Sequence, residues 1–262
     1  MYQESLALSR DLGDIFLIAE GLQDIGGILM EQGKFKEAQE VVEEDLVLRE
    51  KIKDVDGMGT AYMELGNIAF FQGKFAEAEM NFAESLECFH KVGNKSFVSR
   101  MFFSQAMVSF AEGDFARASQ ECEEAITIGQ QLGETSIVAV GLARLGRVSW
   151  AQGDYDLASS RYNEVLKIAQ DTGIKPLLAW AHLYLFLMEV SRGRYSEANL
   201  HLREYVSTWR EINEAEDIGF AFVMLAELAY RWQRLETAAQ LFGAAEHFLP
   251  SFAVKMLSPA ET

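Results

Sequence analysis

The sequence predicts an all-α fold, a right-handed superhelical solenoid of antiparallel helix pairs with about 13 helices. Three observations predict it. Residue types recur every 40 residues, as from Gly33 to Gly73, and apolar residues within each period recur at spacings of three and four. Glycine or asparagine also ends the helical stretches at a fixed place in the period. A period of this size indicates stacked units that share one continuous core.

The chain is predicted to begin with an unpaired second helix at 1–13, because Tyr2 and Leu6 fall in second-helix columns. The helix pairs that follow are expected at 14–53, 54–93, 94–133, 134–173, 174–213 and 214–249, so that the solenoid occupies 1–249. The tail 250–262 ends with Ser258-Pro259-Ala260-Glu261, which has the N-cap, first-turn proline and glutamate of a new helix. This pattern favours a piece of a longer repeat array.

Each pair is predicted to consist of a first helix before a glycine turn and a second helix after it. The turn column comprises Gly33, Gly73, Gly113, Gly153 and Gly193, with Gln233 in the sixth place. Alanine follows five residues later in every repeat, at Ala38, Ala78, Ala118, Ala158, Ala198 and Ala238. Two short turns per period leave roughly 17 residues, or about 25 Å, for each helix.

The second helices are predicted to end at Gly13, Lys53, Gly93, Gly133, Gly173 and Asn213. Glycine and asparagine tolerate the left-handed conformation that closes a helix. Lys53 is the exception, and we expect a looser turn over Asp54 to Asp56. A small-residue column at Gly26, Gly66, Ala106, Gly146 and Ala226 predicts close packing of the two helices, and Phe186 interrupts it.

These columns resemble the tetratricopeptide repeat over nearly the whole chain. In 54–93 they read Leu65-Gly66, Gly73-Lys74-Phe75, Ala78, Phe82 and Ser85-Leu86. The 40-residue period is longer than the usual one, as in the C-terminal sensor regions of bacterial STAND and LuxR-type transcriptional regulators. The segments from Glu4 to Asp14 and from Thr237 to Phe248 resemble those regions.

The charge balance argues against a nucleic-acid partner. Lys and Arg number 23 against 40 Asp and Glu, a net charge of −17, whereas phosphate contacts need clustered basic residues. The most apolar run, 176–190, is shorter than a membrane span. Cys88 and Cys122 are expected to be buried thiols of a cytoplasmic protein, and one disulfide is the alternative.

The sequence offers little that would support catalysis. It has no phosphate-binding loop, no His-Glu-x-x-His and no Cys-x-x-Cys motif, so we expect neither enzymatic activity nor a cofactor. His182 and His201 belong to neighbouring helices and could approach each other. Ordinary packing of these two rings is favoured over a metal pair.

The resemblance implies that the first helices line a concave groove that binds a ligand. Carried over by column, the candidate groove residues are Met63, Asn67, Phe70, Arg100, Phe103, Met107, Phe110, Arg147, Trp150, Trp180, Leu187, Tyr230 and Arg231. Asn67 stands where asparagine holds a peptide backbone in peptide-binding relatives, and Arg147 could hold a carboxylate. Aromatic side chains combined with arginine are typical of interface hot spots.

One column of this set has two interpretations. Met30, Phe70, Phe110, Trp150, Val190 and Tyr230 precede the turn in successive repeats. They either line an open groove or pack between adjacent first helices. An exposed column of this size would mark a binding surface.

The sequence therefore predicts a binding scaffold, the sensor or interaction arm of a bacterial signalling regulator. The expected partner is a protein or peptide segment or a small apolar effector, with no nucleic acid and no membrane. The alternative is a structural module that mediates self-association or assembly.

Overall fold

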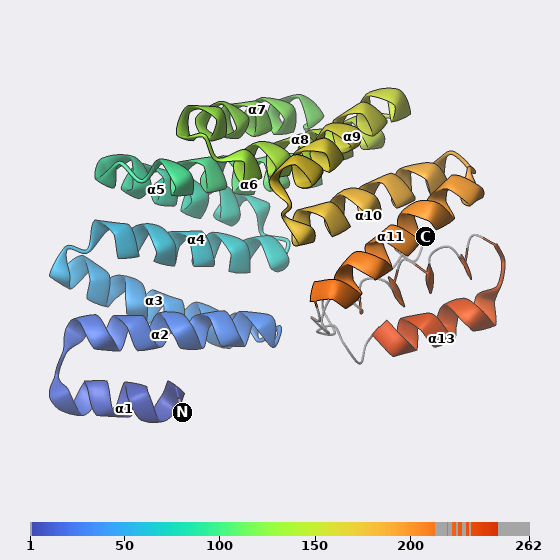
Figure 1. The fold of residues 1–262 in the computed structure, drawn as a ribbon. Helices are drawn as coiled ribbons and strands as arrows, with labels where there is room; N and C mark the ends of the chain where they lie inside the picture. Colours follow the sequence, from blue (N-terminus) through green and yellow to red (C-terminus); the bar gives the residue numbers. More distant parts are fainter. Residues whose placement is uncertain are drawn as a thin grey trace. The chain divides into compact units, whose positions relative to one another are not determined.

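The computed structural model describes residues 2–212, 219, 222–223, 225–226, 229–230 and 232–245 (Figure 1). Every element of regular structure in these ranges is an α-helix. The helices are α1 (Tyr2–Leu12), α2 (Ile15–Glu31), α3 (Phe35–Ile52), α4 (Val55–Phe71), α5 (Phe75–Val92), α6 (Lys95–Ala111), α7 (Phe115–Leu132), α8 (Thr135–Ala151), α9 (Tyr155–Thr172), α10 (Lys175–Ser191), α11 (Tyr195–Ile212) and α13 (Leu235–Ala245). The fold is the predicted all-α solenoid of helix pairs. Asn213 and the predicted tail 250–262 lie outside the described residues.

The chain divides into two compact units, residues 1–137 and 138–262, with the boundary inside α8. In unit 1 each helix from α1 to α7 packs against the next, and the first helices α2, α4 and α6 also contact one another in order (Figure 1). In unit 2, α10 packs against both α9 and α11. Contacts between neighbours in sequence are typical of a solenoid.

The core of each unit is formed by small and apolar side chains shared between neighbouring helices. In unit 1, Ala38 and Val42 of α3 pack with Ala61 and Leu65 of α4. In unit 2, Phe186 of α10 packs with Ala198 and other residues of α11. The alanine that follows each turn by five residues is therefore a core residue, as the repeat pattern predicts.

The small-residue column brings first and second helices into close contact. A Cβ atom at Gly66 would lie 2.4 Å from Cε1 of Phe82, and one at Gly146 would lie 2.5 Å from Cε1 of Tyr162. Phe186, which interrupts the column, is itself buried and packs in one cluster with Leu202. The glycines are thus required because the second helix places a large ring against them.

The turn after α3 corrects one prediction. Lys53 adopts the left-handed conformation (φ 58°, ψ 35°), and α4 begins two residues later at Val55, so the looser turn over Asp54 to Asp56 is wrong. A left-handed lysine costs roughly 1–2 kcal/mol. Asp54 offsets this cost, because its carboxylate accepts a hydrogen bond from the N–H of Gly57 (3.0 Å) and another from Arg49 (2.6 Å).

Two further expectations concern thiols and membranes. Cys88 and Cys122 are buried free thiols, which confirms the preferred interpretation over a disulfide. Within the described part of the chain, no helix combines the length and the apolar character needed to cross a bilayer.

Candidate functional site

The predicted groove residues of unit 1 lie on two neighbouring first helices, α4 and α6. Phe103 is buried, whereas Arg100 is exposed. The half-buried members are Met63, Asn67, Phe70, Met107 and Phe110. Because α2, α4 and α6 contact one another in order, these side chains come from adjacent parts of one layer of helices. The buried Phe103 contributes to the core of this layer.

Asn67 is the most informative residue of this surface. Its carboxamide is half-buried, yet it makes no hydrogen bond to any described residue. Gly27 occupies the same column on α2, and a Cβ atom there would meet nothing within 4 Å. An amide that has free donors and an acceptor next to open space can bind a peptide backbone.

The aromatic column satisfies neither of its two interpretations completely. The Phe70 and Phe110 rings contact the first residues of the following helices, Phe75 and Phe115, at centroid distances of 5.6 and 5.4 Å. Both rings nevertheless remain half-buried. In unit 2, Val190 is buried, and Tyr230 is 51% exposed. Phe70 and Phe110 therefore pack against the helices that follow the turns, and their exposed parts also contribute apolar surface.

The Arg100 guanidinium lies over the Phe97 ring, 4.9 Å from its centroid, at the amino-terminal end of α6. This cation–π contact orients the exposed guanidinium. An oriented guanidinium loses less entropy when it binds an acidic partner than a freely rotating one.

The groove residues of unit 2 form a more aromatic surface. Trp150, Trp180 and Leu187 are half-buried, and Arg147 is exposed. The Trp180 ring lies 6.4 Å from that of Tyr184, which stacks on Tyr162 at 5.0 Å. Burial raises the pKa of Tyr184, and the charges of Arg144 and Arg147 oppose this shift. Arg147 therefore lies near these tyrosines, and Arg231 lies outside the described residues.

A buried ionic cluster in unit 1 was not predicted from the sequence. Asp45 and Arg49 of α3 are both buried. Nε of Arg49 donates to Asp45 (3.0 Å), and Nη2 donates to Glu20 and to Gln23 of α2, both at 2.8 Å. With the bond to Asp54 described above, Arg49 links α2, α3 and the start of α4.

Glu64 of α4 is the second unusual carboxylate of this region. Its Oε2 atom is buried and has no hydrogen-bond partner among the described residues. Burial raises the pKa of Glu64 to about 8, and the negative charge of Asp45 adds to the shift. Burial also raises the pKa of Asp45 to about 6, against the opposing charge of Arg49. Near pH 7 Glu64 is therefore largely protonated.

The sequence indicates this cluster through two residues that depart from the repeat pattern. The positions of Asp45 and Arg49 hold small or apolar residues in the other repeats. The equivalent pairs are Ser85 and Phe89, Ala125 and Gly129, Val165 and Ala169, and Tyr205 and Trp209. Charged residues in otherwise apolar columns predict a buried ion pair.

His182 and His201 do approach each other, as the sequence suggested. Their Nδ1 atoms are 3.1 Å apart, so one ring donates to the other. Burial lowers the pKa of both rings, and for His182 the charge of His201 lowers it further. Among the described residues, no group of three or more His, Cys, Asp or Glu side chains could hold a metal ion.

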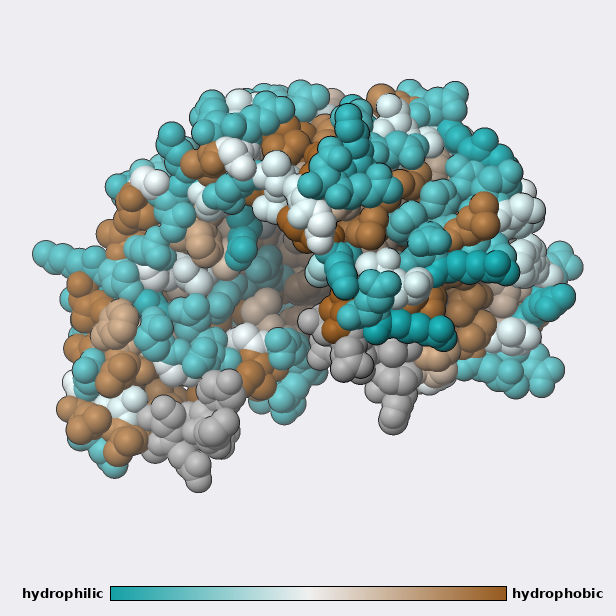
Figure 2. All heavy atoms as spheres, in the orientation of Figure 1, coloured by the Kyte–Doolittle hydropathy of each residue, from teal (hydrophilic) through white to brown (hydrophobic). Residues whose placement is uncertain are grey.

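Several large exposed hydrophobic residues lie far apart along the chain. Val47, Met80 and Leu200 each have more than half of their surface exposed and lie on different second helices. On the face seen in Figure 2, hydrophobic residues lie among hydrophilic ones. Single exposed apolar residues of this kind are normal and do not mark a binding site.

The comparisons with known proteins agree with the fold. Residues 97–171 match the sequence model of the tetratricopeptide repeat family. No curated protein sequence matches the chain. Among solved structures, BtubC from P. vanneervenii is similar at a TM-score of 0.67 and 19% identity, over 81% of this chain and 89% of BtubC.

Two other solved structures are similar over most of this chain. A Rap protein in complex with competence and sporulation factor has a TM-score of 0.68 at 12% identity, over 93% of this chain and 77% of that protein. A STAND signal-transduction ATPase with a tetratricopeptide-repeat sensor, from Pyrococcus horikoshii, has a TM-score of 0.64 at 14% identity. This match covers 93% of the present chain and 38% of the ATPase.

Proposed function

We propose that this chain, a solenoid of the tetratricopeptide-repeat type, is an interaction scaffold that binds an extended peptide segment on its first helices. The observation that carries the proposal is the half-buried Asn67 carboxamide, which has no hydrogen-bond partner among the described residues. The carboxamide offers two N–H donors and an oxygen acceptor, which the C=O and N–H of a peptide backbone could bind.

The surroundings of Asn67 support the same ligand class. Met63 and Phe70 lie one helical turn before and after it, where they could contact side chains of a bound peptide. Space is open above Gly27 on the neighbouring helix. The exposed Arg100 would favour an acidic residue in the ligand.

The regulatory part of the proposal rests on the similar structures. One is a complex of a Rap protein with competence and sporulation factor, and another is a STAND ATPase with a repeat sensor. We infer that the present chain serves as a sensor arm of a larger bacterial regulator. An antibody raised against residues 97–171 should then detect, in native extract, a polypeptide much longer than 262 residues. A band at the length of this chain alone would contradict the sensor-arm role.

Peptide binding is tested by panning a random peptide library on the whole chain and measuring the affinity of the selected peptides by fluorescence polarisation. Asn67→Ala should weaken binding about tenfold, the effect of losing one to two hydrogen bonds. Asn163→Ala is the matched control, since Asn163 is an exposed asparagine on the second helix α9. Selected peptides that bind wild type and Asn67→Ala equally would refute the site.

The same preparations also test the alternative of self-association. Size-exclusion chromatography with light scattering, over a range of protein concentrations, would reveal an oligomer. If that oligomer dissociates in Phe70→Ser or Trp150→Ser and the library yields no peptide, the assembly function replaces the proposed one.

A further inference from the structure

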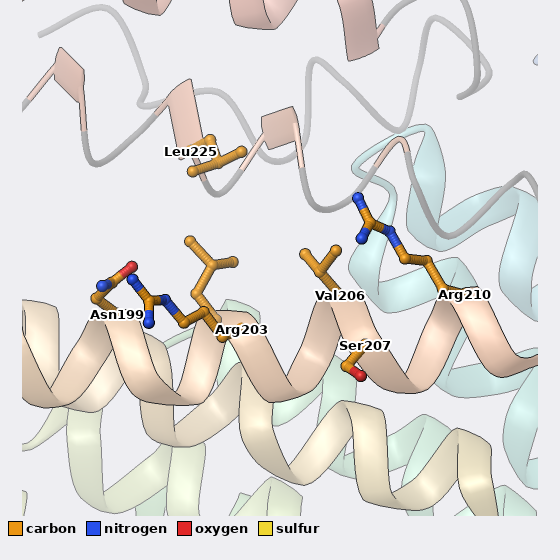
Figure 3. A pocket seen from close by; sticks show the side chains of 7 residues that line it. Asn199, Arg203, Val206, Ser207, Arg210 and Leu225 are labelled. Carbon is orange, nitrogen blue, oxygen red and sulfur yellow. The ribbon is translucent and has the colours of Figure 1, made fainter.

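A second candidate binding site lies in unit 2, on α11. A pocket of about 390 Å³ is lined there by Asn199, Leu202, Arg203, Val206, Ser207 and Arg210, with Leu225 opposite (Figure 3). This volume is near the lower end of the range for ligand pockets, about 300–1,000 Å³. Because α11 is a second helix and Leu225 is not one of the predicted groove residues, the pocket is separate from the first-helix surface proposed to bind peptides.

The pocket has an apolar middle and basic ends. Val206 points into it from α11, Leu225 lies on the opposite side, the Arg203 guanidinium lies beside the Asn199 side chain, and Arg210 extends from the other end (Figure 3). Arg203 and Arg210 are seven residues apart on one helix face, a separation of about 10 Å along the axis. The two positive groups therefore lie on either side of an apolar segment.

Neither guanidinium is neutralised by a residue that the structure describes. Arg203 and Arg210 are exposed, and neither makes an ion pair or hydrogen bond with a described residue. Most other arginines of unit 2 are engaged: Arg192 pairs with Asp156, Arg194 with Glu189, and Arg161 donates to Ser149. In a chain of net charge −17, two arginines beside a pocket that have no acidic partner in the described part of the chain indicate a site for an external anion.

We propose that this pocket binds a small linear organic dianion whose two carboxylates are about 10 Å apart and joined by an aliphatic chain, a spacing set by the helix rise. Each carboxylate would pair with one guanidinium, and the aliphatic chain would lie between Val206 and Leu225. Arginine suits this role because its planar group binds carboxylates through two parallel hydrogen bonds.

Isothermal titration calorimetry on the whole chain tests the proposal with decanedioate as the probe. Hexanedioate is too short to reach both arginines, decanoate carries one carboxylate, and inorganic phosphate reports charge alone. Decanedioate should bind one per chain and at least tenfold more tightly than the other three, with an affinity that falls as salt is added. No saturable heat with decanedioate, or equal binding of decanoate or phosphate, would overturn the proposal.

Variants locate the binding in this pocket. Arg203→Gln and Arg210→Gln should each weaken decanedioate binding at least tenfold, and Arg203→Lys, which keeps the charge, should have an intermediate effect. Lys167→Gln is the control, because it removes one exposed positive charge from α9 of the same unit. Unchanged thermal unfolding would verify that the variants are folded. Full affinity in the double glutamine variant would place the dianion elsewhere and refute the site.

Discussion

At the residue scale, the unusual feature of the chain is the buried carboxyl of Glu64. A protein gains little from burying an unpaired carboxylate, because removing the charge from water costs more than the neighbouring groups return. Glu64 avoids this cost by binding a proton, as its pKa of about 8 indicates. Arg49 does not also neutralise Glu64, because its guanidinium already pairs with Asp45, Asp54 and Glu20.

Glu64 gives the stability of unit 1 a defined pH dependence. Its pKa is raised from 4.5 in the unfolded chain to about 8 in the fold, so its contribution is fully present below about pH 4.5 and is lost as the pH rises to about 8. At about 1.4 kcal/mol per pKa unit, the loss amounts to several kcal/mol. Glu64→Gln should remove most of this decrease in the free energy of unfolding with pH. Urea denaturation at pH 5, 6.5 and 8 would measure it.

The control for this measurement is Glu124→Gln, which changes an exposed glutamate on α7. It should retain the slope of the wild type. If Glu64→Gln also retained the slope, the carboxyl would be ionised in the fold, and a water or an ion would have to satisfy it.

At the element scale, the close approach of first and second helices depends on a reciprocal choice of side-chain size. Gly66 faces Phe82, and Gly146 faces Tyr162. Where the first helix has the large residue Phe186, the second has Leu202 in the same cluster. The two side chains at each of these contacts together fill the space between the first and second helices, and either helix can supply the larger one.

Gly66→Ala should therefore destabilise the protein by roughly 1–3 kcal/mol, the usual cost of overpacking a core. Gly27→Ala is the matched control, because open space surrounds that helical glycine and alanine is the better helix former. It should leave stability unchanged or raise it by up to about 1 kcal/mol in chemical denaturation. The double change Gly66→Ala/Phe82→Leu should recover part of the loss, and no recovery would argue against reciprocal packing.

The histidine pair between α10 and α11 should give stability a pH dependence opposite to that of Glu64. Both pKa values are lowered below 6.5, so the stabilising contribution of the neutral pair is present above about pH 6.5 and is lost as the pH falls below it. Glu189 and Glu204 partly oppose this effect. Hydrogen exchange of α10 and α11, corrected for the intrinsic rate, should accelerate between pH 7 and 5.5 in the wild type and much less in His201→Gln. Equal acceleration in both proteins would exclude the pair as its cause.

At the scale of the whole molecule, helices contact mainly their neighbours in sequence, so effects of substitution should stay local. Gly66→Ala should increase hydrogen exchange in α4, α5 and the helices packed on them. It should leave α9 to α11 as protected as in the wild type, as measured by mass spectrometry of peptic fragments. A uniform increase along the chain would show instead that the protein unfolds as one cooperative body.

The sequence predicted features that every repeat shares and missed features that belong to one place. The turn glycines and the alanine column correctly predicted the helices from α2 to α11 and their pairing. Lys53 was predicted wrongly because a non-glycine residue takes the left-handed conformation there, next to an Asp54 carboxylate that is held by Arg49, a residue that departs from the repeat pattern. The α11 pocket could not be predicted, because it depends on Leu225 lying opposite α11. The groove residues remain a prediction, which is supported by the Asn67 carboxamide, since it has no hydrogen-bond partner among the described residues.

The ionic cluster around Arg49 also has a consequence for how the chain finds its fold. Similar repeats can mispair during folding, when a second helix docks against the wrong first helix. If α3 took the place of another second helix, Arg49 would keep its pair with Asp45 but would lose Glu20 and Gln23 of α2, at a cost of about 1–3 kcal/mol for a buried charge with unmade hydrogen bonds. The cluster therefore identifies α3 among the second helices and would bias assembly toward the native order.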